Sequence, residues 1–274
     1  MRDSKRDHDG YLPESVKSEV EKVVEVAGYL WQKGWAERNA GNISLRINSL
    51  VPDDFQFTER GNVVPCATLP AEAAGFILFV TGAGARLRDL IHRKEEVSCI
   101  LRINNEANGY VLLWGGNAEG FRPTTELISH VQIQLFLQQH KPDHHAVLHT
   151  HCTELILLSH HPLFNDEEAF NHALWKLCPE IRVFVPLGIS CTPYAVSGSD
   201  TLAKLSMEGL QNRDIILWEK HGVLATGKDI TEAFDFLDVA NKGAEMLLKA
   251  WAAGFEPAGM NAQQMAELER LFLS

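Results

Sequence analysis

Segments with the pattern of helices and segments with the pattern of strands are interspersed along the whole of this 274-residue chain. Residues 14–33 carry apolar side chains at helical spacing and end before Gly34, a favourable residue after a helix. Residues 43–47 alternate between apolar and polar side chains as a strand does. Elements of both kinds must bury their apolar faces against each other, so the presence of both kinds throughout the chain predicts a layered α/β or α+β domain.

The same patterns in the rest of the chain predict short strands joined by turns and helices. We expect strands at residues 43–47, 76–80, 99–104, 110–114, 146–150, 183–185, 215–218 and 223–226. We expect helices at residues 14–33, 124–139, 153–160, 166–177, 231–253 and 262–272, and one that opens at Ser199-Asp200. Residues 50–74 hold several prolines and no clear period, so they are expected to be irregular. The middle of the chain contains no linker-like stretch, and residues 1–274 are predicted to form a single domain.

Composition narrows the class of protein. The net charge of −11 argues against a nucleic-acid-binding protein, because such a protein needs a basic surface. Five cysteines, an odd number without a CxxC pattern, favour reduced thiols and a cytoplasmic location. Residues 1–7 lead into no apolar core, and no apolar run approaches the roughly 18 residues of a membrane span. We therefore expect neither a signal peptide nor a membrane segment.

Three histidines have the spacing of a metal site. His149 and His151 lie two residues apart in an expected strand, where residues i and i+2 point to the same face. His221 follows another apolar run and precedes Gly222. Three histidines that leave one position open are typical of a catalytic zinc site. On spacing alone, the alternative remains that these are ordinary strand and turn histidines.

Glu126 follows Pro123-Thr124-Thr125 at the expected start of a helix. One interpretation is structural, because acidic side chains favour the positive end of the helix dipole. The other is functional, because a carboxylate beside a metal can act as general acid and base or as a further ligand. The two interpretations are compatible, since the helix start would also hold the carboxylate in place.

Three segments carry small residues or hydroxyl and amide groups where a turn could bind phosphate with its backbone N–H groups. They are Asn39-Ala40-Gly41-Asn42, Thr81-Gly82-Ala83-Gly84 and Thr124-Thr125. Each segment is equally consistent with a plain connection between elements. The glycine pair is not a dinucleotide fingerprint, because Leu87 stands where a third glycine would be needed.

Taken together, these segments resemble the class II aldolase/adducin superfamily, and within it most closely the rhamnulose-1-phosphate aldolase branch. The resembling stretches occur in the order of that family between about residues 31 and 250. They lie at residues 34–46, 80–84, 113–115, 123–127, 148–153, 174–175, 185–188 and 218–223.

The resemblance implies a three-layer α/β/α sandwich around a mixed, mostly antiparallel sheet. It also implies one Zn²⁺ per subunit and a homotetramer with its sites at subunit interfaces. The residues that match the family's motifs are His149, His151 and His221 as metal ligands, Glu126 as catalytic carboxylate, Asn39, Gly41, Asn42, Gly82, Thr124 and Thr125 as substrate- and phosphate-binding residues, and Glu180 as a candidate second acid. The chain departs from the pattern at Ala83, where the family carries a serine whose hydroxyl would donate to phosphate.

The implied reaction is the reversible aldol cleavage of L-rhamnulose 1-phosphate, a small phosphorylated ketose, to dihydroxyacetone phosphate and L-lactaldehyde. A Lewis-acid metal would stabilise the developing negative charge, and Glu126 would move the proton. Three alternatives stay open: a related fuculose-phosphate aldolase or pentulose-phosphate 4-epimerase, a non-catalytic adducin-like module, and a metal hydrolase of the amidohydrolase type. The epimerases carry Asp where Glu126 stands, a module needs no such set of side chains, and the hydrolases place their histidine pair near the N-terminus.

Overall fold

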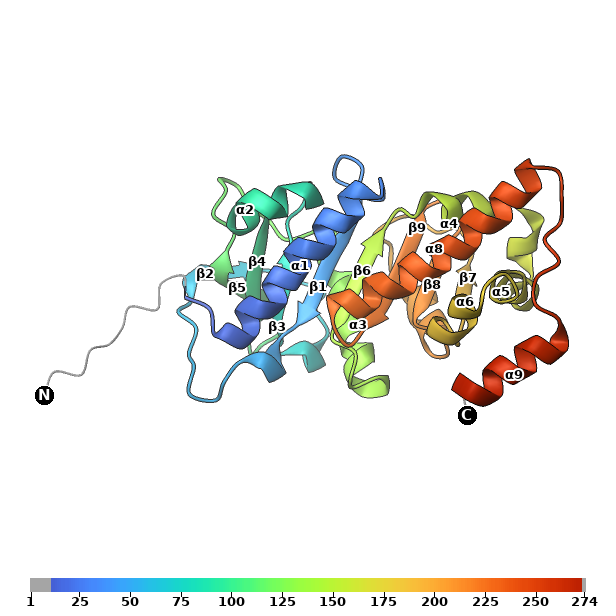
Figure 1. The fold of residues 1–274 in the computed structure, drawn as a ribbon. Helices are drawn as coiled ribbons and strands as arrows, with labels where there is room; N and C mark the ends of the chain where they lie inside the picture. The colour runs from blue at the N-terminus through green and yellow to red at the C-terminus, as the bar shows by residue number, and fades with distance from the viewer. Residues whose placement is uncertain (1–10, 273–274) are drawn as a thin grey trace, which may run out of the picture.

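The structure, a computed structural model, describes residues 11–272. The segment in which no signal peptide is expected, residues 1–7, lies outside these described residues. Within residues 11–272, nine strands form one sheet in the order β2-β5-β4-β3-β1-β6-β9-β8-β7 (Figure 1). The strands are β1 Asn42–Arg46, β2 Arg60–Pro65, β3 Ile77–Thr81, β4 Ser98–Ile103, β5 Gly109–Gly115, β6 Ala146–Thr150, β7 Ile189–Thr192, β8 Ile215–Trp218 and β9 Gly222–Gly227.

The sheet is mixed and mostly antiparallel, which confirms the predicted fold class. In the described part of the chain β7 and β8 run parallel, and the other neighbouring strands pair antiparallel. The α-helices are α1 Glu14–Gln32, α2 Leu90–Val97, α3 Leu127–His140, α4 Thr153–Leu158, α5 Glu167–Trp175, α6 Pro179–Phe184, α7 Asp200–Leu210, α8 Ile230–Ala252 and α9 Ala262–Phe272.

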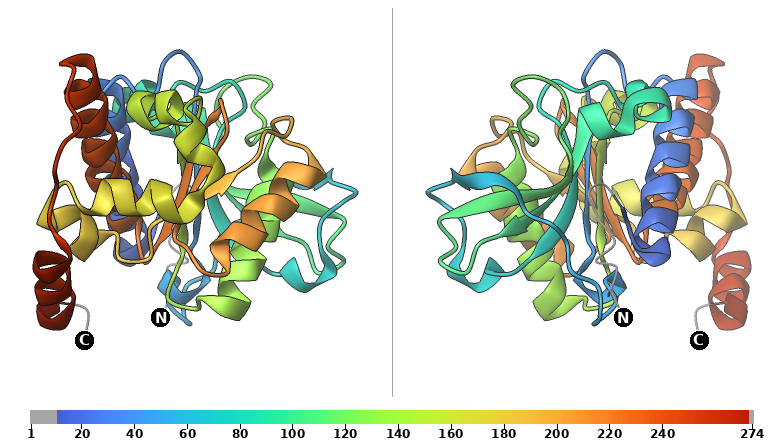
Figure 2. Two further views of the ribbon diagram at one scale, coloured as in Figure 1. Left: turned by 90° about the vertical axis from the view of Figure 1, so that its right-hand side faces the viewer. Right: turned by 90° about the vertical axis from the view of Figure 1, so that its left-hand side faces the viewer.

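Helices cover both faces of the sheet, because successive strand residues point to opposite sides. In β6, Ala146 and Leu148 pack into one hydrophobic core with α1 and α8. Val147, between them, packs into a separate core with α3 and α7. Figure 2 shows these two helical layers with the sheet between them. His149 follows the same alternation and therefore lies on the α3/α7 side of the sheet.

The strand predicted at residues 183–185 is wrong. Val183 lies in α6, which ends at Phe184, and Val185 is the capping residue after it. The β-branched side chains favour a strand, but Pro179 at the first helical position favours a helix start, and burial of Ile181 stabilises the helix.

Three elements were not expected from the sequence pattern. Strand β2 lies inside the stretch predicted to be irregular, and its six residues are all exposed, so it carries no apolar alternation. Strand β7 has only four residues. Helix α2 is interrupted by non-helical backbone angles at Arg93 and buries only Leu90. Elements this short or this exposed leave no periodic signal in a sequence.

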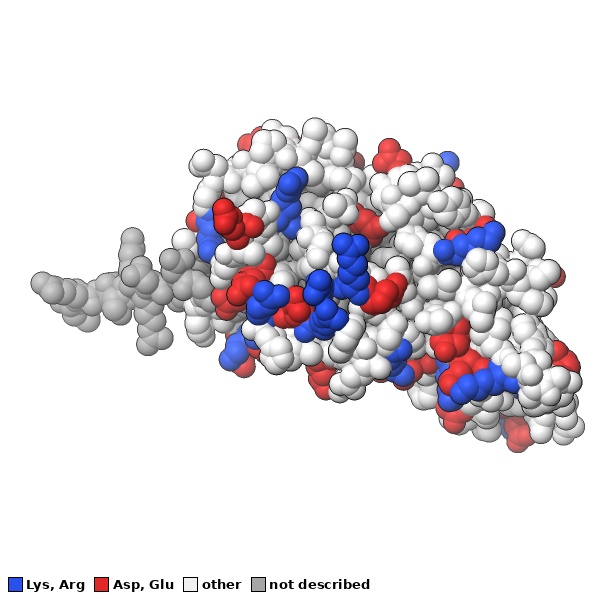
Figure 3. Space-filling model, turned by 90° about the horizontal axis from the view of Figure 1, so that it is seen from above, with Lys and Arg blue, Asp and Glu red and all other residues white. Residues whose placement is uncertain are grey.

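The surface seen in Figure 3 carries charges of both signs. Lys and Arg side chains on this face lie next to Asp and Glu side chains and form no continuous basic stripe there. All five cysteines are free thiols. Among residues 11–272, no helix is both long enough and apolar enough to cross a bilayer.

Candidate metal centre and active site

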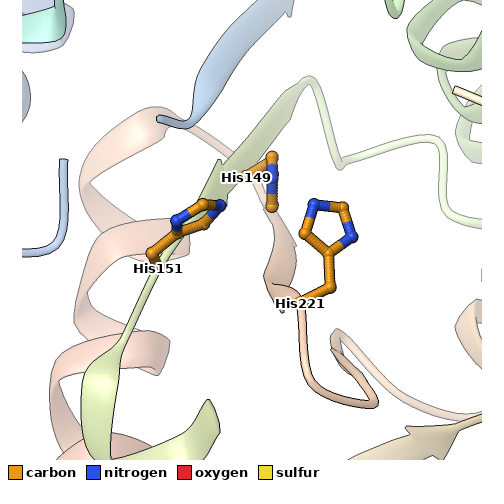
Figure 4. A group of neighbouring side chains, drawn as sticks. All are labelled: His149, His151 and His221. Carbon is orange, nitrogen blue, oxygen red and sulfur yellow. The ribbon is translucent and has the colours of Figure 1, made fainter. Parts of the chain in front are cut away.

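Strand pairing brings the three histidines together. His149 is in β6, His151 follows the end of that strand, and His221 directly precedes β9. In the antiparallel β6–β9 pair, His149 is opposite Leu224 and Thr150 is opposite Val223. The start of β9 therefore lies beside the end of β6, although about seventy residues of chain separate them. One ring nitrogen from each histidine lies within 4.8 Å of the others, and Figure 4 shows the three rings facing one another.

The outer nitrogens of two rings are already engaged. Nδ1 of His149 lies 2.9 Å from the carbonyl oxygen of Val223. Nδ1 of His151 lies 2.7 Å from Oε1 of Glu37. Because carbonyl and carboxylate oxygens accept, each Nδ1 carries the proton and each Nε2 keeps a free lone pair. Such second partners orient histidine ligands, so the group has the features of a divalent metal site of the kind that class II aldolases use.

Burial keeps His149 and His221 neutral. Desolvation, the largest cause, together with the neighbouring His151 and His221, lowers the pKa of His149 to about 3, against the opposing effect of Glu126. Burial and His151 likewise lower the pKa of His221. The indole of Trp218 contacts both rings, with centroids 4.6 Å from His149 and 5.1 Å from His221. Neutral imidazoles are the form that binds metal, so protons do not compete for the ring nitrogens of His149 and His221 near pH 7.

Gly222 is required by the packing of the histidines. A Cβ at this position would lie 2.8 Å from Cε1 of His149 and 2.9 Å from Cδ2 of His151. It would also lie 2.9 Å from the carbonyl oxygen of Thr150. Real Cβ contacts are longer than these, so any side chain here would displace the rings. A glycine is therefore needed directly after His221 for the rings to keep their positions.

Glu126 precedes the helix that we expected it to begin. Helix α3 starts at Leu127, and Glu126 is its N-cap residue, whose carbonyl oxygen accepts from the N–H of His130. Nδ2 of Asn42 donates to Oε2 of Glu126 at 2.6 Å, and the hydroxyl of Ser197 donates to Oε1 at 2.6 Å. Asn42 is also opposite His149 in the β1–β6 pair, so these contacts place the carboxylate on the histidine side of the sheet.

The carboxylate of Glu126 is ionised. Burial by itself raises the pKa, but the neighbouring His149 and the hydrogen bonds from Ser197 and Asn42 outweigh burial and lower it to about 2. A carboxylate in this state is ready to accept a proton.

Two of the three segments predicted to bind phosphate, Thr81-Gly82-Ala83-Gly84 and Thr124-Thr125, lie side by side. Gly82 and Pro123 form an isolated antiparallel bridge, and the N–H of Thr124 donates to the carbonyl oxygen of Thr81. Both turns line one open cavity of about 1030 Å³. Its lining includes Gly82, Ala83, Gly84, Thr124, Thr125, Arg86 and Arg122.

Of the remaining predicted site residues, Gly41 lies beside the histidines, whereas in the described part of the chain Asn39 and Glu180 make no hydrogen bond to the other site residues. Gly41 has φ +80° and approaches the backbone of His149, where a Cβ would lie 2.6 Å from the carbonyl oxygen. Asn39 is exposed in the turn before β1 and makes no hydrogen bond to the other site residues within residues 11–272. Glu180 is exposed at the start of α6 and accepts a hydrogen bond from the thiol of Cys178 at 2.6 Å. It lines a different hollow, with Lys33 and Trp35, so its contribution to a site stays a prediction.

Four contributors were missed by the sequence analysis: Glu37, His130, Ser197 and Trp218. Glu37 is 114 positions from the histidine that it contacts, and Ser197 is 71 positions from Glu126. No spacing rule connects residues so far apart. Trp218 adjoins an expected strand end and His130 is one turn from Glu126, but both have the sequence context of ordinary core residues.

Comparison with known proteins agrees with this geometry. A family model described as the class II aldolase and adducin N-terminal domain matches residues 21–248. The chain belongs to the class II aldolase and adducin family. The family resemblance seen in the sequence is thereby confirmed.

Similar proteins cover nearly the whole length of this family member. A rhamnulose-1-phosphate aldolase of Bacteroides thetaiotaomicron is 38% identical over 94% of this chain and 95% of its own. One from Listeria welshimeri is 29% identical over 92% of this chain and 91% of its own. The crystal structure of a sugar-phosphate aldolase from Thermotoga maritima superposes with a TM-score of 0.75 at 30% identity, over 89% of this chain and 99% of that one.

We predict that Gly222→Ala weakens metal binding, because its Cβ would collide with the rings of His149 and His151. The affinity for Zn²⁺, measured by competition with a chromophoric chelator, should fall by about tenfold or more. Gly28→Ala is the matched control, since its Cβ would meet only a methyl group of Ile91 at 3.6 Å. Wild-type affinity in Gly222→Ala would contradict this packing.

We predict that buried His130 makes stability depend on pH. Burial lowers its pKa from 6.5 to about 4, partly opposed by the charge of Glu126, so the unfolded chain binds a proton that the folded protein excludes. Stability is therefore lost as pH falls from about 6.5 towards 4.

In metal-free protein, His130→Gln should remove on the order of 2 kcal/mol from the difference in unfolding free energy between pH 7 and pH 5. Urea denaturation at the two pH values measures this difference. The other buried histidines are present in both proteins and cancel in the comparison. An unchanged pH dependence in the variant would show that His130 is not held neutral by burial.

Proposed function

We propose that this protein catalyses the reversible aldol cleavage of L-rhamnulose 1-phosphate to dihydroxyacetone phosphate and L-lactaldehyde, in L-rhamnose catabolism, with Zn²⁺ as its metal. The observation that carries the proposal is the three-histidine site with an ionised carboxylate nearby, in a chain 38% identical to a rhamnulose-1-phosphate aldolase over 94% of its length.

His149, His151 and His221 would hold the metal through one nitrogen each. A bound divalent cation supplies Lewis-acid stabilisation of negative charge on the ketone fragment. The ligand set supports Zn²⁺, because three imidazoles with an open position are typical of catalytic zinc. Neutral ligands also leave the full charge of the cation available, which a carboxylate ligand would reduce.

Glu126 would move the proton. As the C3–C4 bond breaks, the C4 hydroxyl gives up its proton and becomes the aldehyde, the bonding electron pair stays on C3 of the ketone fragment, and a proton must be delivered to that carbon. In the direction of synthesis, the same carbon must lose a proton to a base. Glu126 is ionised, as a base must be before it accepts a proton, and its position beside the histidines supports this second role.

The phosphate of the substrate would bind in the cavity beside the two turns. Gly82 and Thr124-Thr125 provide backbone and hydroxyl groups there. Ala83 lacks the hydroxyl that its family carries, and Arg86 and Arg122 line the same cavity as cationic partners for an anion. Binding the non-reacting end of the substrate would orient its reacting carbons.

The surroundings of this site are also proposals. We infer a single domain over residues 1–274, a cytoplasmic location and a homotetramer with sites at subunit interfaces. Glu180 is exposed on α6 and lines a hollow that shares no residue with the substrate cavity. It would contribute a second acid to a partner subunit's site across such an interface.

We predict that chelation abolishes cleavage and that Zn²⁺ restores it. L-Rhamnulose 1-phosphate, L-fuculose 1-phosphate and ribulose 5-phosphate are compared on one preparation, with product aldehyde and epimer measured separately. Metal-free protein should lose about 100-fold or more of its activity towards the first substrate, because charge stabilisation is lost. Full activity without metal would refute the metal mechanism, and preference for another substrate would identify a sibling enzyme.

We predict that Glu126→Gln lowers kcat by about 10²–10⁴-fold, the contribution of a positioned acid-base group, while zinc stays bound. An amide can accept from Asn42 and donate to Ser197, so both hydrogen bonds can persist and only the proton transfer is lost. Zinc content and kcat are measured on the same sample. If zinc is lost with activity, Glu126 is chiefly a ligand and another group moves the proton.

A further inference from the structure

A chain of hydrogen-bonded polar side chains runs through the interior behind Glu126. Asn42, Ser44, His130 and Gln134 are all buried. Asn42 and Ser44 come from β1, and His130 and Gln134 come from successive turns of α3. Buried polar groups cost free energy unless they are paired, so such a chain between a strand and a helix calls for a reason.

Gln134, at the end far from Glu126, sets the direction in which the hydrogen bonds of this polar chain are donated. Nε2 of Gln134 lies 2.9 Å from the carbonyl oxygen of His145, which only accepts, so the amide nitrogen faces this way. The same nitrogen lies 3.2 Å from Oγ of Ser44 and donates to it. The hydroxyl of Ser44 then donates its own proton to Nδ1 of His130, at 2.8 Å.

The direction continues to the carboxylate. With Nδ1 of His130 accepting, its proton is on Nε2, which donates to Oδ1 of Asn42 at 2.5 Å. Burial lowers the pKa of His130 to about 4, so the ring is neutral and carries one proton only. Nδ2 of Asn42 faces Glu126 and donates to Oε2. Both ends of the chain therefore require the same orientation of every member.

One unpaired atom supports this direction. Oε1 of Gln134 is buried without a hydrogen-bond partner among residues 11–272. Turning the amide over would place Oε1 against the carbonyl oxygen of His145, where two acceptors would meet, and would leave the amide nitrogen in the position that has no partner. Oε1 stays unpaired because the orientation of the amide is fixed by the hydrogen bonds that its nitrogen donates.

The two oxygens of Glu126 are held differently. Oε2 accepts from Asn42, whose amide is locked by His130 in the interior. Oε1 accepts from Ser197, which is exposed in the loop between β7 and α7. A serine hydroxyl can rotate and can also accept, whereas the Asn42 amide cannot turn without placing its oxygen against the carboxylate.

We propose that His130 is a positioning residue that fixes the amide of Asn42, and through it the carboxylate of Glu126, so that Oε1 is the oxygen that exchanges the proton. The inference rests on the proposed function for the reaction itself. It adds an atom-level assignment: Oε2 is the anchored oxygen, and Oε1 is the reacting one. His130 does not touch substrate and acts only through Asn42.

Two substitutions separate the bonds that His130 makes. His130→Gln places an amide nitrogen where Nε2 was, so it keeps the donor to Asn42 and gives up the contact with Ser44. His130→Asn reaches only to the position of Nδ1, so it keeps the contact with Ser44 and gives up the donor to Asn42. His144→Asn is the matched control, because His144 is a half-buried histidine that hydrogen-bonds Thr226 through Nδ1 at 3.0 Å.

We predict that kcat of the zinc-loaded enzyme falls about 10- to 100-fold in His130→Asn, with KM and zinc content unchanged, and stays within about threefold of wild type in His130→Gln. His144→Asn should keep wild-type kcat whatever it does to thermal stability. Crystal structures of both His130 variants should show the Glu126 carboxylate displaced in the Asn variant and in place in the Gln variant.

Equal losses of kcat in the two His130 variants, or a carboxylate that stays in place in His130→Asn, would overturn the proposal. These outcomes differ from failure of the proposed function. If the wild-type protein cleaves none of the three sugar phosphates, the assigned reaction is wrong, and the carboxylate position in the variants still decides whether His130 positions Glu126.

Discussion

The antiparallel pairing of β6 with β9 is the interaction on which the rest of the site depends. Its register puts Thr150 opposite Val223, so His149 and His151 flank the backbone that carries His221 and Gly222. The carbonyl oxygen of Val223 then orients the ring of His149. A shift of one residue would turn His149 to the α1/α8 face and put Leu148 in its place, because neighbouring strand residues point to opposite faces. The apolar cores on both faces of β6 prevent that shift.

Glu126 is positioned by a different kind of interaction. The metal site is formed by strands held in register by backbone hydrogen bonds and apolar packing. The carboxylate is held by side-chain hydrogen bonds that connect β1, α3 and the loop after β7. Two rigid systems thus meet at Asn42, which is paired with His149 through the backbone and with Glu126 through its amide. This arrangement fixes the position of the Glu126 carboxylate relative to the three histidines. It does not require Glu126 to be a fourth metal ligand.

Much of the fold could be predicted from the sequence wherever a segment carried a clear period. Helices α1, α8 and α9 and strands β3, β6 and β8 lie within a few residues of their predicted positions. The predictions failed where burial did not alternate. Strand β2 is exposed throughout, and residues 183–185 end a helix whose stability comes from packing rather than from the propensities of its valines. The three metal-site histidines and Glu126 could be proposed because their residue types and local spacing indicate metal-binding and acid-base chemistry. Glu37 and Ser197 could not, because they are far in sequence from the residues that they contact, and His130 has the sequence context of a core residue.

The sequence by itself determined which side chains have metal-binding and acid-base chemistry, and which segments are strands with two histidines on one face. The tertiary structure alone decided which nitrogen of His149 and of His151 faces the site, that Glu126 is ionised, and that its two oxygens are held unequally. The physical reason is that the first set of properties belongs to residue types and local periodicity. The second set depends on partners such as Val223, Asn42 and Ser197, which are 71 to 84 positions distant and become neighbours only when the sheet forms.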